Sequence, residues 1–302
     1  MMAKLPFSLG LATVIFTFIL CTAQVNLDEV FTIQSGRTDG GCDRFYNQAA
    51  QTGVLDDWLS EISYSLDYAL SAIEDYNGDI RVRRAMRTFF GIANTGRARD
   101  GTPRADTIAE ITLNIQRVHE FFNHVDDNND PFYSPAGNYL FCDSNFLVYQ
   151  SDDTQALDFQ ANDIVDSEGN LVRIADVPAY MAALNENINN DVWWSGDLTP
   201  VNGYYFSTTG SECCDGTKLG LTAVIQPLMA GPNGQAQEDD PISSIVLCER
   251  SFTPSPAPND TYRDANAQLA MGTNLADVVP KSSTLLYEAF HLVLGAGPTR
   301  FL

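Results

Sequence analysis

The sequence is poor in histidine and in basic residues. It has three histidines, and its 17 lysine and arginine residues are outnumbered by 39 aspartate and glutamate residues, which gives a formal charge of −22 at pH 7. Binding to DNA, RNA or anionic lipid relies on basic side chains that neutralise phosphates, so this charge argues against those partners and effectively excludes nucleic acid. Any site built on histidine must use His119, His124 or His291.

Several common site motifs are also missing. No Cys-x-x-Cys pair occurs, so the cysteines do not form a zinc cluster of the usual spacing. The sequence has neither a Gly-x-Ser-x-Gly nucleophile elbow nor a phosphate-binding loop. After residue 20, no run of apolar residues approaches the length of about 18 that a membrane span needs.

The N-terminus has the order of a secretory signal peptide. Lys4 is followed by an apolar run over residues 5–20 and by small residues at 21–23. An N-terminal membrane anchor is the alternative, but the run is short and Pro6 interrupts it. We therefore expect residues 1–23 to be removed, and the mature protein to be secreted, extracellular and free of the membrane. Loss of Lys4, the only charged residue in this segment, changes the formal charge from −22 to −23.

The remaining chain has the composition of a folded protein. The sequence is 44% hydrophobic and 11% aromatic, which disordered chains do not reach. Residues 24–302 are enough for one large domain or two small ones.

Five cysteines remain after signal removal, which predicts two disulfides and one free thiol in an oxidising compartment. Five choices of the free cysteine, each with three pairings, leave fifteen arrangements open. A bridge between the adjacent Cys213 and Cys214 is a strained alternative. A single glycosylation sequon begins at Asn259. The five cysteines are Cys42, Cys142, Cys213, Cys214 and Cys248.

The N-terminal third predicts helices. Apolar residues recur at three- and four-residue spacing over residues 55–73, 80–90 and 108–125, and turn-forming residues follow the first and third stretches. The second stretch carries an arginine cluster, which we expect to pair with neighbouring carboxylates, with an anionic substrate as the alternative. These arginines are Arg81, Arg83, Arg84 and Arg87.

The middle of the chain predicts short strands and loops, and the end predicts one more helix. Helices followed by strands and a final helix favour an α+β fold over alternating β-α-β units. The expected strands lie at residues 139–149, 163–165, 171–174, 203–208 and 242–248, the expected loops at 231–241 and 251–260, and the expected final helix at 284–294.

The final helix contains part of a zinc-peptidase motif. In His-Glu-x-x-His, the two histidines share one helix face and bind zinc, and the glutamate acts as general base on the metal-bound water. Here Glu288 and His291 have the spacing of the base and the second ligand, and Tyr287 stands at the position of the first ligand. On its own this pattern is weak, because Glu-x-x-His occurs often by chance.

Longer stretches of the sequence resemble the secreted metallopeptidase-like proteins of filamentous fungi, in which the corresponding helix reads leucine-leucine-histidine-glutamate-alanine-phenylalanine-histidine. The resemblance extends over most of the mature chain. It rests on residues 31–33, 40–42, 81–85, 89–92, 140–143, 176–180, 202–206, 220–223, 262–266, 269–273, 279–282 and 285–291.

This resemblance implies a single domain over residues 24–302 with a zincin-like fold, related to deuterolysin and the lysine-specific metallo-endopeptidases. Its parts would be an N-terminal helical region, a central irregular β region and a C-terminal active-site helix. The resemblance further implies zinc as cofactor, a protein or peptide as substrate, Glu288 as catalytic base and His291 as metal ligand.

Two departures from the family pattern predict impaired catalysis. Tyr287 replaces the first histidine, and a phenol with a pKa near 10 binds zinc less well than imidazole at neutral pH. A third ligand is expected after the helix, but residues 292–302 contain no His, Asp, Glu or Cys. The chain therefore looks shortened at its C-terminus. A retained intron or a shifted reading frame near Gly295 would produce this ending, and a genuine loss of catalysis is equally compatible with it.

Two other patterns are weaker. His119 and His124 are five residues apart, about 140° around a helix, and so do not share a metal; a structural, partly buried His119 is the simpler interpretation. Residues 126–130 resemble the start of a calcium loop, but Pro131 replaces the required glycine and Gly137 the bidentate glutamate.

Two hypotheses follow. In the first, the chain is a secreted zinc endopeptidase-family protein that uses Glu288 and His291. In the second, it is a non-catalytic secreted relative that acts as a binding or structural protein on the same fold.

Overall fold

The protein is described by a computed structural model. The description covers residues 25–36, 40–92, 97, 101–123, 138–196, 198, 202–207, 210–232, 234–254, 261–262 and 278–295.

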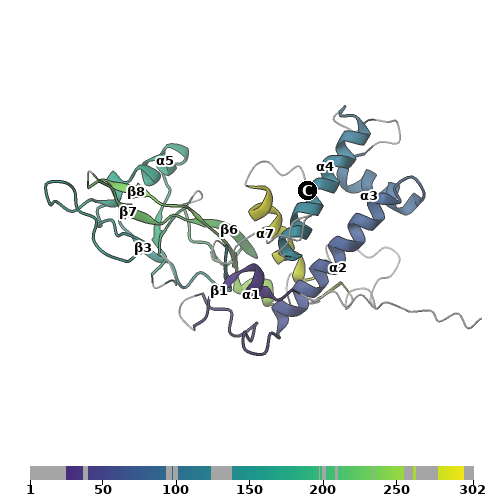
Figure 1. Ribbon diagram of the computed structural model, residues 1–302, viewed down its shortest axis with the longest axis horizontal. Helices are drawn as coiled ribbons and strands as arrows, with labels where there is room; N and C mark the ends of the chain where they lie inside the picture. Colours follow the sequence, from purple (N-terminus) through teal and green to yellow (C-terminus); the bar gives the residue numbers. More distant parts are fainter. Residues whose placement is uncertain are drawn as a thin grey trace, which may run out of the picture.

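The helices lie mainly in the N-terminal third and at the end of the described chain (Figure 1). They are α1 (Leu27–Val30), α2 (Val54–Glu74), α3 (Ile80–Phe90), α4 (Arg104–Asn123), α5 (Pro178–Glu186) and α7 (Ser282–Leu294), with short 3-10 turns η2 (Ile174–Asp176) and η3 (Glu249–Phe252).

The strands form three small sheets. The largest has the order β1-β2-β9-β6, the second β3-β4-β5, and the third β7-β8. Their bounds are β1 (Thr32–Ile33), β2 (Asn138–Phe141), β3 (Val148–Gln150), β4 (Val192–Trp194), β5 (Tyr204–Phe206), β6 (Gly220–Ile225), β7 (Leu228–Ala230), β8 (Ala236–Glu238) and β9 (Ile242–Leu247).

The four-stranded sheet is mixed. Strands β1, β2 and β9 are parallel, and β6 joins β9 in the antiparallel direction as the edge strand. One face of this sheet packs against a layer formed by α2, α4 and α7, which we call the helical layer. The core between them includes Trp58, Phe121, Leu140, Ile245 and Leu285.

The other face of the sheet is covered by a second core. Tyr139, Phe141 and Val246 point to this side because side chains alternate along a strand, and they meet residues such as Tyr205 from the β3-β4-β5 sheet. Beyond lies the distal β region, residues 148–196, 202–206, 228–232 and 234–238, whose own core is formed around Trp194, Tyr204 and Leu228.

The apolar stripe predicted for residues 55–73 is confirmed in α2, which buries Leu55, Trp58 and Ile62. The predicted second helix is α3: Asp79 caps its N-terminus by accepting from the N–H of Arg81, and Gly91 ends it in the left-handed conformation. These end signals explain why the helix bounds could be anticipated.

Two disulfides are present, Cys42–Cys142 and Cys214–Cys248. Cys213 is the remaining thiol and is buried, so the expectation of two bridges and one free thiol is confirmed, and Cys213 and Cys214 are not joined to each other.

The α+β class is confirmed, with corrections to its elements. Residues 163–165 and 171–174, predicted as strands, form isolated bridges such as Val165–Leu171, and residues 139–149 contain two strands, β2 and β3, separated by residues 142–147. The predicted loop at residues 231–241 contains β8, which pairs with β7. The glycine-rich part is the turn of that hairpin, since Gly231 donates to the carbonyl of Gln235. Among the described helices, none has the length and apolarity needed to span a bilayer.

Candidate functional site

The three residues of the partial zinc motif all lie on α7. This helix packs against β6 and β9 of the sheet and against α2 and α4. Leu285 and Ala289 anchor it in the core, and both are fully buried. The next question is where Tyr287, Glu288 and His291 point.

Glu288 turns toward the edge strand β6 and is only 6% exposed. The hydroxyl of Thr222 on β6 lies 3.0 Å from Oε2 of Glu288 and 2.8 Å from its backbone carbonyl oxygen. The single hydroxyl proton can serve one acceptor at a time, so Thr222 links the helix to the strand through either oxygen.

Burial raises the pKa of the Glu288 carboxyl, while the Thr222 hydrogen bond and the neighbouring His291 act in the opposite direction. Desolvation is the largest of these influences. Glu288 therefore holds a proton at higher pH than an exposed glutamate does, a property that suits a group involved in proton transfer.

Gly220 allows this close approach of helix and strand. A Cβ atom at this position would lie 3.1 Å from Cγ of Glu288 and 3.1 Å from a methyl carbon of Thr284. A larger residue would require the side chains of Glu288 and Thr284 to shift.

Tyr287 and His291 lie together on a more exposed side of α7. Their rings meet edge to face with centroids 4.6 Å apart, and Tyr287 is 45% exposed. The helix thus brings the three predicted residues into one turn, but the Glu288 carboxylate is directed to Thr222 beneath β6.

The described residues do not fit a catalytic zinc. Such a site takes three protein ligands, usually His, Asp, Glu or Cys, and within the described ranges no three such side chains come together as a possible metal group. His291 is one nitrogen donor, Tyr287 is a weak ligand, and one oxygen of the Glu288 carboxylate faces the Thr222 hydroxyl. Of residues 292–302, where a third ligand is expected from the family pattern, those after Gly295 lie outside the described residues.

The outer edge of β6 is open for pairing. Leu219 accepts from the N–H of Cys248, and antiparallel pairing alternates, so Gly220, Thr222 and Val224 direct their N–H and C=O groups away from β9. Further along, Gln226 faces the same way and exchanges two hydrogen bonds with Tyr204. In the part of the chain that the structure describes, the outward groups of Gly220, Thr222 and Val224 have no backbone partner.

A separate groove lies next to the Cys214–Cys248 disulfide, where the segments that follow β2 and β9 meet the segment that precedes β6. It has a volume of about 400 Å³ and is lined by three segments, at residues 143–145, 212–218 and 248–253. None of its lining residues comes from α7.

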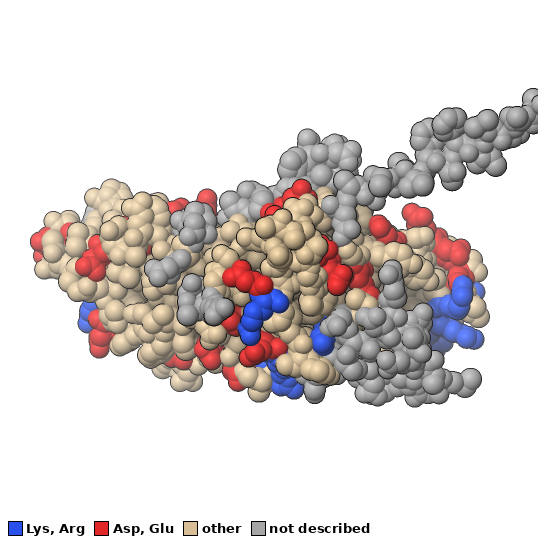
Figure 2. All heavy atoms as spheres, turned by 90° about the horizontal axis from the view of Figure 1, so that it is seen from below, with Lys and Arg blue, Asp and Glu red and all other residues tan. Residues whose placement is uncertain are grey.

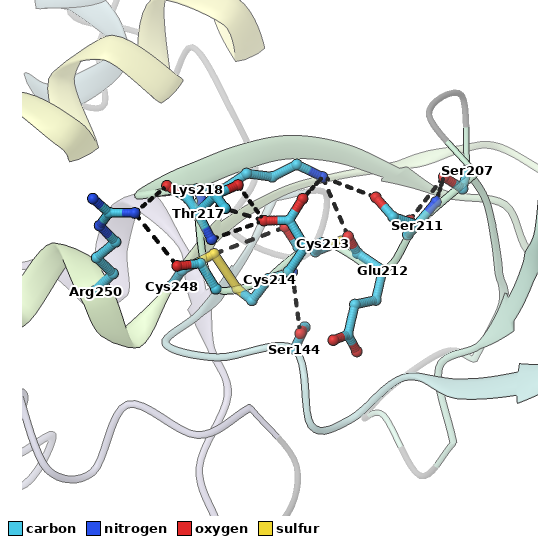
Figure 3. A network of polar contacts seen from close by, with 12 residues as sticks. Ser144, Ser207, Ser211, Glu212, Cys213, Cys214, Thr217, Lys218, Cys248 and Arg250 are labelled. Atoms are coloured by element: carbon cyan, nitrogen blue, oxygen red, sulfur yellow. Dashed lines mark hydrogen bonds and ion pairs between the residues drawn. A yellow bond between two sulfur atoms is a disulfide. The ribbon is translucent and has the colours of Figure 1, made fainter.

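The positively charged side chains of this groove already make contacts within the protein (Figure 3). Nζ of Lys218 lies 3.3 Å from Oγ of Ser211, 3.3 Å from the carbonyl oxygen of Glu212 and 3.6 Å from Asp215. Arg250 donates to the carbonyl oxygen of Thr217. Because these cations already hold the loop together, the groove is a weaker candidate than the α7–β6 site.

Cys213 lies in the same network and is unreactive in its setting. Burial raises the pKa of its thiol to about 12, so the nucleophilic thiolate is scarce at neutral pH.

His119 has the structural role expected of it. Its Nε2 lies 2.7 Å from Oδ1 of Asp67, which ties α4 to α2, and Asn123 contacts the same ring nitrogen. His124, the calcium-like residues 126–130 and the acceptor Asn259 lie outside the described residues.

Sequence reasoning missed Thr222 and Gly220 as members of the site. Both fall in residues 220–223, which carried part of the family resemblance, but nothing local in that stretch indicates a contact with a glutamate 66 residues later. Comparisons of the chain with protein-family models, with curated proteins and with solved structures give no match, so the site is interpreted from its own residues.

Proposed function

We propose that the protein is a secreted, zincin-like relative of the metallopeptidases related to deuterolysin, and that its α7–β6 site binds an extended polypeptide without cleaving it. The observation that carries the proposal is the open edge of β6 directly beside the buried Glu288 of α7.

The arrangement of the elements supports the scaffold part of the proposal. A helix with Glu288 and His291 at peptidase spacing packs under the antiparallel edge strand of a mixed sheet. Helices α2 and α4 support that helix from behind. The partial motif is therefore placed at a strand edge, where a polypeptide is able to approach it.

The edge of β6 supports the binding part. An extended peptide adds to an open strand through main-chain hydrogen bonds, which provide affinity with little sequence preference. Gly220, Thr222 and Val224 offer alternate N–H and C=O groups over a length of five residues. Val224 is half exposed, so its side chain is available for contact with an added strand.

The side chains that could bind a metal support the non-catalytic part of the proposal. The described residues supply fewer ligands than a catalytic zinc requires, and no hydrolytic step is assigned to them. Glu288 instead has a mechanical role: its carboxylate and its carbonyl oxygen hold β6 against α7 through Thr222.

An active zinc endopeptidase is the second candidate. It is favoured by the raised pKa of Glu288 and by the position of His291 close enough to influence that pKa. This candidate requires ligands from outside the described residues.

Secretion is supported by the two disulfides, which persist in oxidising compartments, and by the signal-like order of residues 1–23.

The test uses the full chain and a fluorescein-labelled neutral peptide of alternating Val and Thr residues flanked by Gly and Ser. We expect saturable binding by fluorescence anisotropy. Val224→Pro, which removes an outward N–H, should weaken it at least tenfold, whereas Val224→Thr, which keeps the N–H, should not. Circular dichroism checks that both variants fold.

Mass spectrometry of the peptide and metal analysis of the protein separate the candidates. Intact peptide after prolonged incubation supports the non-catalytic site. Cleavage that depends on stoichiometric zinc and is lost in His291→Ala would establish the peptidase instead. A folded protein that neither binds nor cleaves the peptide contradicts both.

A further inference from the structure

Helix α3 carries a local positive charge on a strongly acidic protein. It holds four arginines in 11 residues and no acidic residue. Over the whole sequence, acidic residues outnumber basic ones by 39 to 17. Positive surface is therefore scarce, and its concentration on one helix sets this helix apart.

Two of these arginines have no partner within the described chain. Arg81 pairs with Asp79 at 2.6 Å, and Arg83 donates to the carbonyl oxygen of Asn77. Arg84 and Arg87 are exposed, and the structure records no hydrogen bond or ion pair for either guanidinium group among the described residues. Within that part of the chain, the expectation that the cluster pairs with carboxylates holds for Arg81 only.

An apolar side chain lies on the same face of α3 as these two cations. Ile80 stands four and seven residues before them, and it is 53% exposed. On the adjacent α2, Tyr64 and Tyr68 are exposed on one helix face, and Tyr68 is close enough to Arg81 to raise the pKa of its guanidinium. Figure 2 shows basic side chains gathered at the end of the molecule where α2 and α3 lie.

The opposite face of α3 fixes the helix in place. Met86 is buried in a small core with Tyr76, Ile92 and Ile111, and Val82 packs against it. The exposed face is thus presented by an anchored helix and does not need to order on binding, which lowers the entropic cost of association.

We propose that the arginine face, defined as Ile80, Arg84 and Arg87 of α3 with Tyr68 of α2, binds an acidic segment of a partner protein that also carries apolar side chains. Free guanidinium groups bind carboxylates through paired hydrogen bonds. Arginine and aromatic residues are also the types enriched at the energetic centre of protein interfaces.

The charge of the rest of the molecule selects this kind of partner. A long polyanion or an anionic bilayer extends past α3 and meets a protein of net charge −22, which repels it. A short polypeptide segment contacts the arginine face alone, and its apolar side chains contact Ile80 and Tyr68. This inference is independent of the proposed role of β6.

The test measures binding of a fluorescein-labelled peptide of alternating Asp or Glu with Leu or Phe to the full chain at low salt. We expect saturable binding that weakens as salt increases, and that falls at least tenfold in the Arg84→Glu, Arg87→Glu double variant. Arg173→Glu, an exposed arginine of the distal β region, is the control for added negative charge and should reduce binding much less.

A second variant tests the apolar part of the face. Ile80→Ser should weaken binding severalfold without changing the net charge, whereas Phe89→Ser, about 140° around α3 from Arg84, should change it little. Amide exchange of α3 should show that the helix stays folded in both variants. The same peptide with Lys in place of the acids should not bind. The proposal is overturned if the double variant binds as the parent does, or if anionic vesicles or a sulfated polysaccharide bind in an arginine-dependent way while the acidic peptide does not.

Discussion

The helical layer and the distal β region are stabilised by different means. The helical layer uses long elements, α2 with 21 residues and α4 with 20, which bury continuous apolar stripes. The distal β region uses strands of three residues and isolated bridges. There, side chains of turn residues supply many of the backbone's hydrogen-bond partners.

Two similar turns illustrate the second strategy. Oδ1 of Asp158 accepts from the N–H groups of Gln160 and Asn162, and eight residues later Asp166 accepts from Glu168 and Asn170 in the same way. A carboxylate that accepts from amides two and four residues ahead fixes a turn without any core. The comparison teaches that burial of apolar side chains orders the helical layer, whereas local polar contacts contribute much of the order of the distal β region.

The largest expected effect concerns the two disulfides. Cys42–Cys142 spans 100 residues and closes a loop around α2, α3 and α4, whereas Cys214–Cys248 spans 34. From chain entropy, replacing both cysteines by alanine should cost roughly 4–5 kcal/mol for the first bridge and roughly 3–4 kcal/mol for the second.

Urea unfolding of the two double variants measures this difference. Suppose that removing Cys214–Cys248 lowers the free energy of unfolding more than removing Cys42–Cys142 does. Loop length then does not control stability here, and the helical layer depends on its apolar core alone.

The next effect concerns Glu288, a buried polar group of the helical layer, and its contribution to the pH dependence of stability. Burial raises the pKa of this carboxyl in the folded state. Its contribution to stability is therefore fully present below the unfolded pKa and is lost as the pH rises through the folded pKa. In Glu288→Gln, which stays neutral and still accepts from Thr222, that part of the pH dependence should disappear.

Unfolding free energies measured from acid to neutral pH show the difference. Glu238→Gln, an exposed glutamate of β8, controls for the loss of one negative charge. If the variant and parent curves run parallel through this range, Glu288 is not held in the buried, protonation-favouring environment described above.

The smallest effect tests a turn of the distal β region. Asp158→Ala removes the acceptor of two backbone N–H groups at a partly exposed position, and should destabilise by about 1 kcal/mol. Asp163→Ala makes the same change of charge at an exposed neighbour for which the described structure records no side-chain hydrogen bond, and should change stability less. Equal effects would assign the loss to charge and not to the turn.

The sequence indicates the helical layer better than the β strands. The stripe of Leu55, Trp58 and Ile62 extends over many turns, so its period is unmistakable, and α2 follows it. Strands β4 and β8 have three residues each, too few for alternation to be visible, and β8 lies in a stretch whose glycine content indicates a loop.

The candidate site was predictable only along the helix. Spacing places Tyr287, Glu288 and His291 in one turn, and α7 bears this out. That Glu288 faces β6 depends on tertiary packing, because the bond to Thr222 joins residues far apart in sequence. The cysteine count predicted two bridges and one thiol, but the choice among fifteen pairings required the fold.

The Cys42–Cys142 bridge has a consequence for limited proteolysis. All of α2, α3 and α4 lie between its two cysteines. A single cut within this ring leaves both fragments covalently attached, so the protein retains its full mass until a reductant is added. A protease that attacks the helical layer thus opens the chain without releasing a piece of it.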